Sequence, residues 1–187
     1  MVQEQSNSVA MVDLSNRRER SRRPLSAMTN YDTIAHHFPD SPDNNGLEGI
    51  TVNTRTNHVV VVKECQPGLL IELDSTLTTI LSTRVLQPSQ GFMHPKLKAE
   101  KLDFSGLSYD SSSDTLWIVS DKGRCLFQYD WTGDTVLQRL DLTISTGDNP
   151  KRIHKPEGVA FDPGRKRMYV VSDRDADLYV FKLHDDC

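Results

Sequence analysis

The sequence lacks the motifs that mark the common enzyme classes. No two of its six histidines have HxxxH or HExxH spacing, and it has neither a GxSxG segment nor a phosphate-binding glycine loop. These motifs hold a metal, a nucleophile or a phosphate, so the usual signs of a zinc protease, a serine hydrolase and a nucleotide-binding enzyme are missing. His154, in the segment before Glu157, is the one weak candidate for a general base.

Paired cysteines, long apolar runs and excess positive charge are also lacking. Cys65, Cys125 and Cys187 are odd in number and contain no CxxC pair, which argues against a disulfide framework and a thiolate zinc site. Runs such as 59–62 are far shorter than the roughly 18 to 20 apolar residues that span a bilayer. A net charge of −4 gives no general attraction to phosphate backbones, so nucleic acid is not an expected partner.

The composition is that of one soluble domain with a polar extension. Of the 187 residues, 36% are hydrophobic and 26% charged, and the mean hydropathy is −0.51. Residues 1–45 are rich in Ser, Asn, Arg and Pro without a sustained apolar period, which predicts a disordered N-terminal extension. Five arginines in 16–24 are either a patch for an anionic surface or a solvated charged segment. The first thirty residues lack the apolar core of a secretory signal, so a cytoplasmic location is the default expectation.

Residues 46–187 contain a threefold repeat. Gly49, Gly106 and Gly158 are each followed fifteen residues later by an acid. The segments between these markers are GITVNTRTNHVVVVKE, GLSYDSSSDTLWIVSD and GVAFDPGRKRMYVVSD, each with a short apolar strand, a polar turn and a second apolar strand. Such spacing is typical of a supersecondary unit that buries its faces against its neighbours.

The repeat predicts an all-β fold built from β-propeller blades. Third strands are expected at 69–73, 125–129 and 178–183, and fourth strands at 77–85 and 135–142. Four antiparallel strands in a unit of fifty-odd residues are typical of a propeller blade. The last unit ends before a fourth strand, and Ser8–Leu14 is the one apolar stretch that we expect to supply it from the N-terminus.

The number of blades is smaller than in a closed ring. Propellers usually close with four to eight blades, and residues 46–187 supply three. Further blades belong to a longer protein, a second copy completes the ring by self-association, or the units form an open arc. Open ends would expose apolar blade faces and sheet edges.

The residues before the repeat glycines are the main candidates for chemistry. Glu48, Ser105 and Glu157 begin the inner strands, which lie nearest the axis of a propeller, and Asp103 lies two residues before Ser105. Carboxylates that converge on one cavity repel each other, and protonation or a bound cation relieves the repulsion. A hard cation such as calcium accepts such oxygens. The alternative is that each glycine permits a close approach at the axis while the acids stay solvated.

A second set of acids follows the second strands. Glu64, Asp121 and Asp173 form this second acidic ring and are flanked by basic residues. They are either strand-end ion pairs and turn caps or groups that face a ligand.

These repeats resemble a known family. The pieces SGLSYD, LWIVSD and PEGVAFD, in this order, are similar to the C-terminal half of the SdiA-regulated (YjiK-like) six-bladed β-propeller family over residues 47–183. The resemblance implies a propeller related in architecture to calcium-dependent lactonases and phosphotriesterases. It also implies metal ligands at Glu48, Ser105 and Glu157, where Ser105 replaces the Asn or Asp common in those relatives.

Three functions remain open from the sequence. The first is a propeller binding module with calcium in its channel and an unassigned small-molecule or protein partner. The second is a calcium-dependent hydrolase of esters or lactones, in which the cation would polarise a carbonyl. The third is a protein-interaction scaffold with an inert channel.

Overall fold

The computed structural model describes residues 1–39, 46–65, 67–146 and 149–183. The strands are β1 (Val2–Gln3), β2 (Ser8–Asp13), β3 (Arg18–Pro24), β4 (Leu47–Asn53), β5 (His58–Lys63), β6 (Leu69–Leu73), β7 (Ile80–Val85), β8 (Gly106–Asp110), β9 (Thr115–Ser120), β10 (Cys125–Asp130), β11 (Thr135–Asp141), β12 (Thr143–Thr146), β13 (Asn149–Arg152), β14 (Pro156–Asp162), β15 (Arg167–Ser172) and β16 (Asp177–Lys182). Single-turn 3₁₀ helices are η1 (Glu4–Ser6), η2 (Leu25–Ala27), η3 (Tyr31–Thr33), η4 (Ala35–His37), η5 (Pro88–Gln90) and η6 (Ala99–Lys101). In these ranges no helix is long and apolar enough to cross a membrane.

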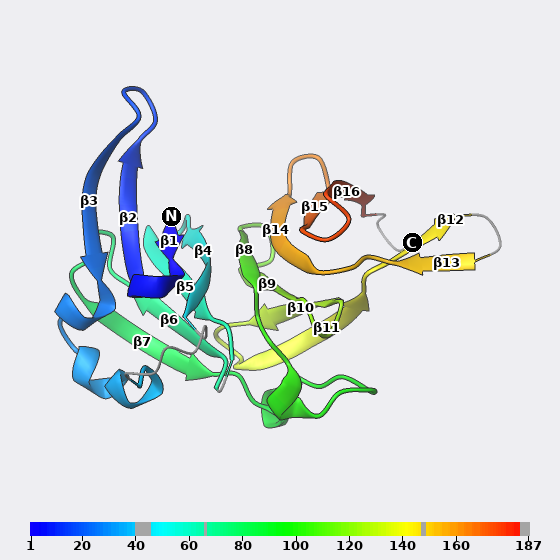
Figure 1. Ribbon diagram of the computed structural model, residues 1–187, viewed down its shortest axis with the longest axis horizontal. Helices are drawn as coiled ribbons and strands as arrows, with labels where there is room; N and C mark the ends of the chain where they lie inside the picture. The colour runs from blue at the N-terminus through cyan, green and yellow to red at the C-terminus, as the bar shows by residue number, and fades with distance from the viewer. Residues whose placement is uncertain (40–45, 66, 147–148, 184–187) are drawn as a thin grey trace.

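Antiparallel sheets follow one another in an open arc (Figure 1). In the described residues the sheet orders are β1-β2-β3, β4-β5-β6-β7, β8-β9-β10-β11 and β14-β15-β16, and a separate hairpin pairs β12 with β13. We call the four sheets blades A, B, C and D in chain order. The inner strands β4, β8 and β14 lie side by side, because β8 contacts both β4 and β14. The predicted all-β propeller architecture is therefore confirmed.

The repeated sequence produces the repeated geometry of the first hairpin in blades B, C and D. In each blade the turn between the first and second strands contains a left-handed residue at the same repeat position. These residues are Asn57, Asp114 and Lys166, with φ of 61°, 59° and 48°. Polar turn residues tolerate this conformation and let the two apolar strands pair directly. The predicted third and fourth strands are present as β6, β10 and β16 and as β7 and β11.

The repeat glycines permit close packing of the inner strands at the axis. A Cβ atom on Gly49 would lie 2.8 Å from the Cα of Gly106, and one on Gly106 would lie 2.7 Å from the carbonyl oxygen of Glu157. Real Cβ atoms do not approach backbone atoms so closely. Each glycine therefore allows one inner strand to pack against the next.

Residues 1–39 form a partial blade, which corrects the predicted disordered extension in that range. Here β1 pairs with β2, β2 pairs with β3, and Val9 and Leu25 are buried against blade B. The segment Val2-Gln3-Glu4 matches the ends of the second strands, such as Val119-Ser120-Asp121, and Asn7 has the positive φ of its equivalent Arg124. Blade A thus consists of the end of a second strand followed by a third and a fourth. Residues 40–45 of the predicted extension lie outside the described residues.

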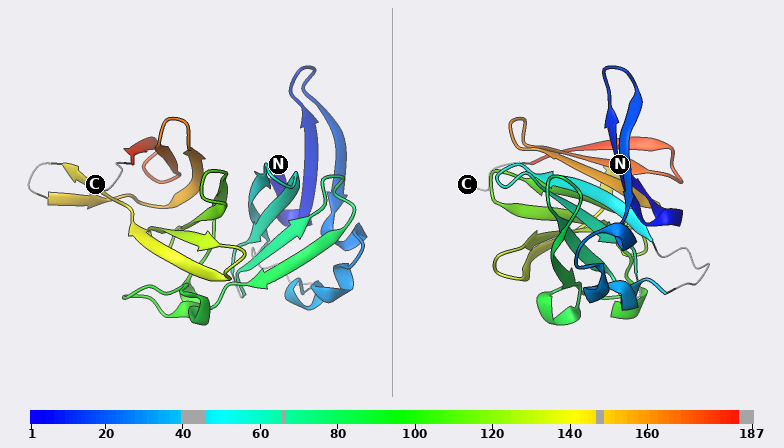
Figure 2. Two further views of the ribbon diagram at one scale, coloured as in Figure 1. Left: turned by 180° about the vertical axis from the view of Figure 1, so that it is seen from behind. Right: turned by 90° about the vertical axis from the view of Figure 1, so that its left-hand side faces the viewer.

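The composition of β3 explains why disorder was predicted for this part of the chain. It has the sequence RERSRRP and forms the outer edge of its sheet, with ion pairs from Arg20 to Asp13 and from Arg22 to Glu19. Charged side chains on an edge strand oppose further strand pairing. The hairpin tip between β2 and β3 extends beyond the rest of the molecule (Figure 2).

Apolar clusters fill the interfaces between successive blades. One cluster joins blades A and B, a second joins B and C, and a third joins C and D. No described residues cover the outer face of blade D in this way: Val171, Leu178 and Val180 are 50%, 59% and 52% exposed. The stretch Ser8–Leu14 does not complete blade D, because β2 pairs with β1 and β3. That expectation is therefore wrong.

Two of the three cysteines lie within the described residues. Cys65 and Cys125 are buried in different blades and form no disulfide within the described ranges. Cys187 lies outside them.

Candidate metal centre

The candidate acids lie near the start of the inner strands and the end of the second strands. Two of them, Glu48 and Glu157, lie at irregularities in strand pairing. The pairing of β4 with β5 shifts register between Leu47 and Gly49, and the pairing of β14 with β15 shifts between Pro156 and Gly158. Glu48 and Glu157 are the extra residues at these two irregularities. A bulge residue leaves the ladder and can aim its side chain away from the regular alternation.

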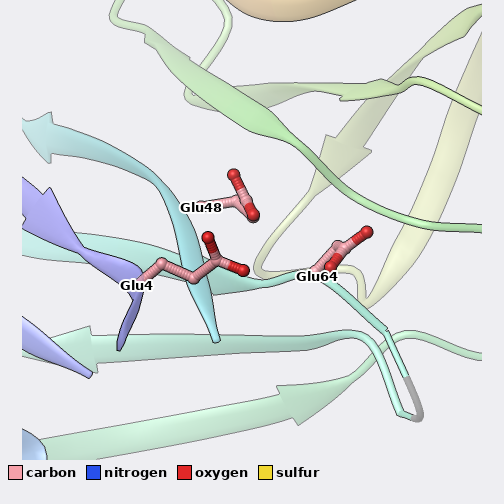
Figure 3. Close-up of side chains that lie close together, drawn as sticks. All are labelled: Glu4, Glu48 and Glu64. Carbon is pink, nitrogen blue, oxygen red and sulfur yellow. The ribbon is translucent and has the colours of Figure 1, made fainter. Parts of the chain in front are cut away.

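Three carboxylates meet at this end of blades A and B. One oxygen from each of Glu4, Glu48 and Glu64 lies within 4.8 Å of the others. Figure 3 shows the three side chains close together, each from a separate segment of the chain. We call this group the glutamate cluster. Among the Asp, Glu, His and Cys groups that the structure describes, no other three come this close.

Burial and neighbouring charges disfavour the ionised form of Glu48. Its pKa is raised to about 8, first by burial, then by the charge of Glu4, a hydrogen bond with Glu4 and the charges of Glu64 and Glu157. The pKa of Glu64 is also raised, first by burial. An Oε1 atom of Glu4 is buried without a hydrogen-bond partner among the described residues. A buried carboxylate oxygen of this kind is costly unless a proton or a cation compensates it.

A calcium ion fits this donor set. Calcium binds carboxylate oxygens at roughly 2.3–2.6 Å, so two ligands of one ion lie at most about 5 Å apart. The separations within the glutamate cluster satisfy this limit. Glu4, Glu48 and Glu64 are the residues that would hold the ion, and water would complete its coordination.

The other predicted ligands have different surroundings. Lys155 lies 2.8 Å from Glu157 and 2.5 Å from Asp173, and the hydrogen bonds to Asp173 and Glu157 raise its pKa. Glu157 is close enough for its charge to raise the pKa of Glu48, but it is not a member of the cluster. Lys155 therefore pairs with both Glu157 and Asp173.

Asp103 and Ser105 stabilise the start of blade C. Asp103 is 1% exposed and accepts hydrogen bonds of 2.9 Å from the Ser120 hydroxyl and the Lys122 amide. Lys122 also forms an ion pair with Asp103 at 3.5 Å. The backbone amide of Ser105 donates to the carbonyl of Val119 at 3.0 Å. These contacts give Asp103 a loop-fixing role.

Asp121 follows β9 of blade C, at the same repeat position as Glu64 in blade B and Asp173 in blade D. Burial raises its pKa, and the charges of Asp103 and Glu157 raise it further, while Lys155 and Lys122 act in the opposite direction. The acids before the repeat glycines and the acids after the second strands therefore lie at the same end of the blades, where Glu48 comes close to Glu64.

His154, in the segment before β14, is fixed by contacts with the turn after β15. Its Nδ1 atom lies 3.2 Å from Asp175 Oδ1, and its backbone amide donates to the same carboxylate at 3.1 Å. Its carbonyl accepts a hydrogen bond from the Ser172 hydroxyl. These contacts tie the segment before β14 to the turn after β15.

Sequence reasoning missed Glu4. The residue lies in the segment that composition assigned to disorder, but it occupies the same repeat position as Glu64, Asp121 and Asp173. The short match of Val2-Gln3-Glu4 to Val62-Lys63-Glu64 was the available signal.

Comparison with known proteins agrees with this architecture. A chain from the crystal structure of a nidogen/laminin complex superposes with a TM-score of 0.56 at 12% identity, over 96% of this chain and 56% of that chain. The crystal structure of the RRP9 WD40 repeats gives a TM-score of 0.47 at 10% identity, over 95% of this chain and 46% of that chain. The chain thus spans about half the length of these two chains. The similarity to the chain of the nidogen/laminin complex concerns the fold alone.

The fold and its repeats define a β-propeller protein. The SdiA-regulated family model matches residues 1–182, so the chain belongs to the SdiA-regulated family. The match includes blade A, which the sequence resemblance left out. A search of curated proteins finds no significant match.

Proposed function

We propose that this SdiA-regulated propeller chain is a binding module that holds calcium at the glutamate cluster. The observation that carries the proposal is the meeting of three partly buried carboxylates, one of which has a buried oxygen without a hydrogen-bond partner among the described residues. An ion bound by Glu4, Glu48 and Glu64 would join blade A to blade B and offer its remaining positions to a ligand. The chain's own binding partner would then be an oxygen-rich small molecule or protein group.

Calcium titration by calorimetry and thermal unfolding tests the proposal. Calcium should raise the stability of the wild-type chain by about 2.7 kcal/mol at one hundred times its Kd, because it binds the folded state. Glu48→Gln and Glu4→Gln should remove this stabilisation. Glu157→Gln is the matched control and should retain it, because Lys155 already pairs with Glu157. Equal calcium responses in wild type and Glu48→Gln, or none in the wild type, would contradict the proposal.

The hydrolase alternative uses the same ion and needs an added observation. Activity of the calcium-loaded chain on lactones or aryl esters, lost in Glu48→Gln, would assign it that reaction. Calcium binding without such activity supports the binding module alone.

An interaction scaffold is a second candidate, favoured by the outer face of blade D. Val171 and Leu178 are 50% and 59% exposed, whereas Val119 and Leu126, their counterparts in blade C, are buried by blade D. A further blade-like sheet, including one from a second copy, would cover this face in the same way. Self-association of the chain is the expected consequence.

A further inference from the structure

A pocket lies between blades B and C, at the end of the strands opposite the glutamate cluster. It has a volume of about 200 Å³ and reaches from the turn after β4 to the turn after β10. We call it the interblade pocket. Its apolar and aromatic lining residues are Val60, Tyr109, Leu116 and Trp131, and its polar lining residues are Asn53, Thr56, Glu72, Asp114, Thr115 and Thr132. The two complete blades form it, so it depends neither on the open face of blade D nor on the calcium proposal.

The charged side chains that line the interblade pocket are acidic. Glu72 and Asp114 are the ionisable acids of the pocket, and no Lys, Arg or His of the described residues lines it. The carboxylate of Glu72 is fixed by His58 Nδ1 at 2.8 Å and by the Ser82 hydroxyl at 2.6 Å. Each carboxylate oxygen has two lone pairs, so both can accept one further hydrogen bond from a ligand. A fixed, partly buried carboxylate favours a cation.

The aromatic walls favour the same charge. The guanidinium carbon of Arg84 lies 5.4 Å from the ring centroid of Trp131, and Arg84 is not among the residues that line the pocket. A cation in the pocket would share the Trp131 ring with Arg84. Tyr109 is 9% exposed, and its hydroxyl donates to Asp114 at 2.6 Å, which directs the polar end of the side chain toward the rim. Asp114 is paired with the guanidinium of Arg55 at 3.1 Å. The partners of Glu72 are the imidazole of His58 and a serine hydroxyl, so Glu72 is the carboxylate of the pocket without an arginine or lysine partner among the described residues.

The apolar walls and the volume limit the size of that ligand. Val60 and Leu116 are 4% and 3% exposed and supply the hydrophobic surface. An apolar cavity of about 150 Å³ holds benzene, so this volume accepts a compact group of similar or slightly larger size. Small-molecule sites combine apolar walls, which hold the body of the ligand, with polar groups that fix its orientation.

We propose that the interblade pocket binds a small organic ammonium compound. Its cation would lie beside Glu72 and the rings of Tyr109 and Trp131, and the apolar part of the ligand would lie against Val60 and Leu116. This site is separate from the proposed calcium centre and from its ligand.

Titration of the full chain with choline and with its neutral isostere 3,3-dimethylbutan-1-ol tests the proposal. The two probes have nearly the same shape and differ in the positive charge. At low ionic strength choline should bind roughly tenfold more tightly than the neutral isostere. This ratio corresponds to the free energy that a cation–π contact and a nearby carboxylate together contribute. Equal affinity of the two probes, or no saturable binding of choline, would overturn the proposal.

Two variants assign the binding to this pocket. Glu72→Gln keeps the shape of the side chain and should weaken choline roughly tenfold with little effect on the neutral isostere. Glu100→Gln is the matched control: this exposed glutamate of η6 lines neither the pocket nor the glutamate cluster, so its substitution should leave choline binding unchanged. The fluorescence change on choline binding should also be lost in Trp131→Phe. Unaltered choline affinity in Glu72→Gln, or a loss in Glu100→Gln, would contradict the assignment, whatever the outcome of the calcium titration.

Discussion

Glu4 and Glu48 lie next to each other, although one follows β1 of blade A and the other lies in β4 of blade B. Gly46 makes this approach possible, because a Cβ on it would lie 2.6 Å from the carbonyl oxygen of Glu4. The amide of Leu47 also donates to the side chain of Asn7 at 3.2 Å. The N-terminal blade is therefore part of the candidate metal centre.

The stability of the calcium-free chain should depend on pH through Glu48. The pKa of its carboxyl group rises from an ordinary value of 4.5 to about 8 in the folded chain, first because of burial and then because of Glu4. Between these values the folded state binds the additional proton, so the stabilisation is complete below about 4.5 and is lost as the pH rises to about 8. The loss should be on the order of 1 kcal/mol, since solvent screens a group of this exposure.

Urea unfolding in the presence of chelator, at several pH values across this window, measures the effect. Glu48→Gln removes the titrating group and should have a flatter pH dependence than the wild type. Identical profiles for the two proteins would refute the assignment.

The repeat glycines should differ in their tolerance of a side chain. A Cβ on Gly106 would meet the Glu157 carbonyl oxygen at 2.7 Å, whereas the nearest atom to a Cβ on Gly158 is Val171 Cβ at 3.6 Å. Gly106→Ala should lower the free energy of unfolding by about 1–3 kcal/mol through overpacking. Gly158→Ala should change it by no more than about 0.5 kcal/mol. Chemical denaturation of both variants makes the comparison, and equal losses would argue against close packing at the axis.

Blade A should contribute to the stability of the whole chain. Leu25 is fully buried between blades A and B, and Leu14, in the hairpin tip, is 87% exposed. Leu25→Ala should reduce the free energy of unfolding by about 2–5 kcal/mol, because it leaves a cavity. Leu14→Ala is the matched control and should have an effect below about 0.5 kcal/mol. If thermal unfolding shows no difference between these variants, residues 1–39 are not packed as described.

The open face of blade D should affect association more than folding. Leu178 and Leu126 occupy the same repeat position, but they are 59% and 2% exposed. Leu178→Ser should keep the free energy of unfolding within about 0.5 kcal/mol and decrease self-association. Leu126→Ser should cost about 2–5 kcal/mol. Sedimentation velocity and urea unfolding provide the two measurements, and a wild-type chain that stays monomeric at high concentration would rule out self-association through this face.

Much of the fold was predictable because its signals are local. Alternating apolar residues and polar turns located the strands of blades B, C and D, and the glycine positions marked the inner strands. Blade A escaped this reasoning because β3 is an arginine-rich edge strand and β1 has two residues. A strand of this composition is recognised by its partners more than by its own pattern.

The candidate site was predictable in part. Glu48 was identified by its place before Gly49, and Glu64 by its place after the second strand. Their contact with Glu4, and the pairing of Glu157 with Lys155, depend on side chains from separate segments. Spacing along the chain does not specify such contacts.

The amino-acid sequence alone determined the strand periodicity, the blade repeat and the acids at the strand ends, because these follow from backbone conformation and the twofold alternation of side chains. Only the tertiary structure decided which acids converge, which are neutralised by lysine and which apolar face stays uncovered. Those outcomes depend on how one blade packs against the next, and each inner strand approaches its neighbour through contacts between residues far apart in the chain.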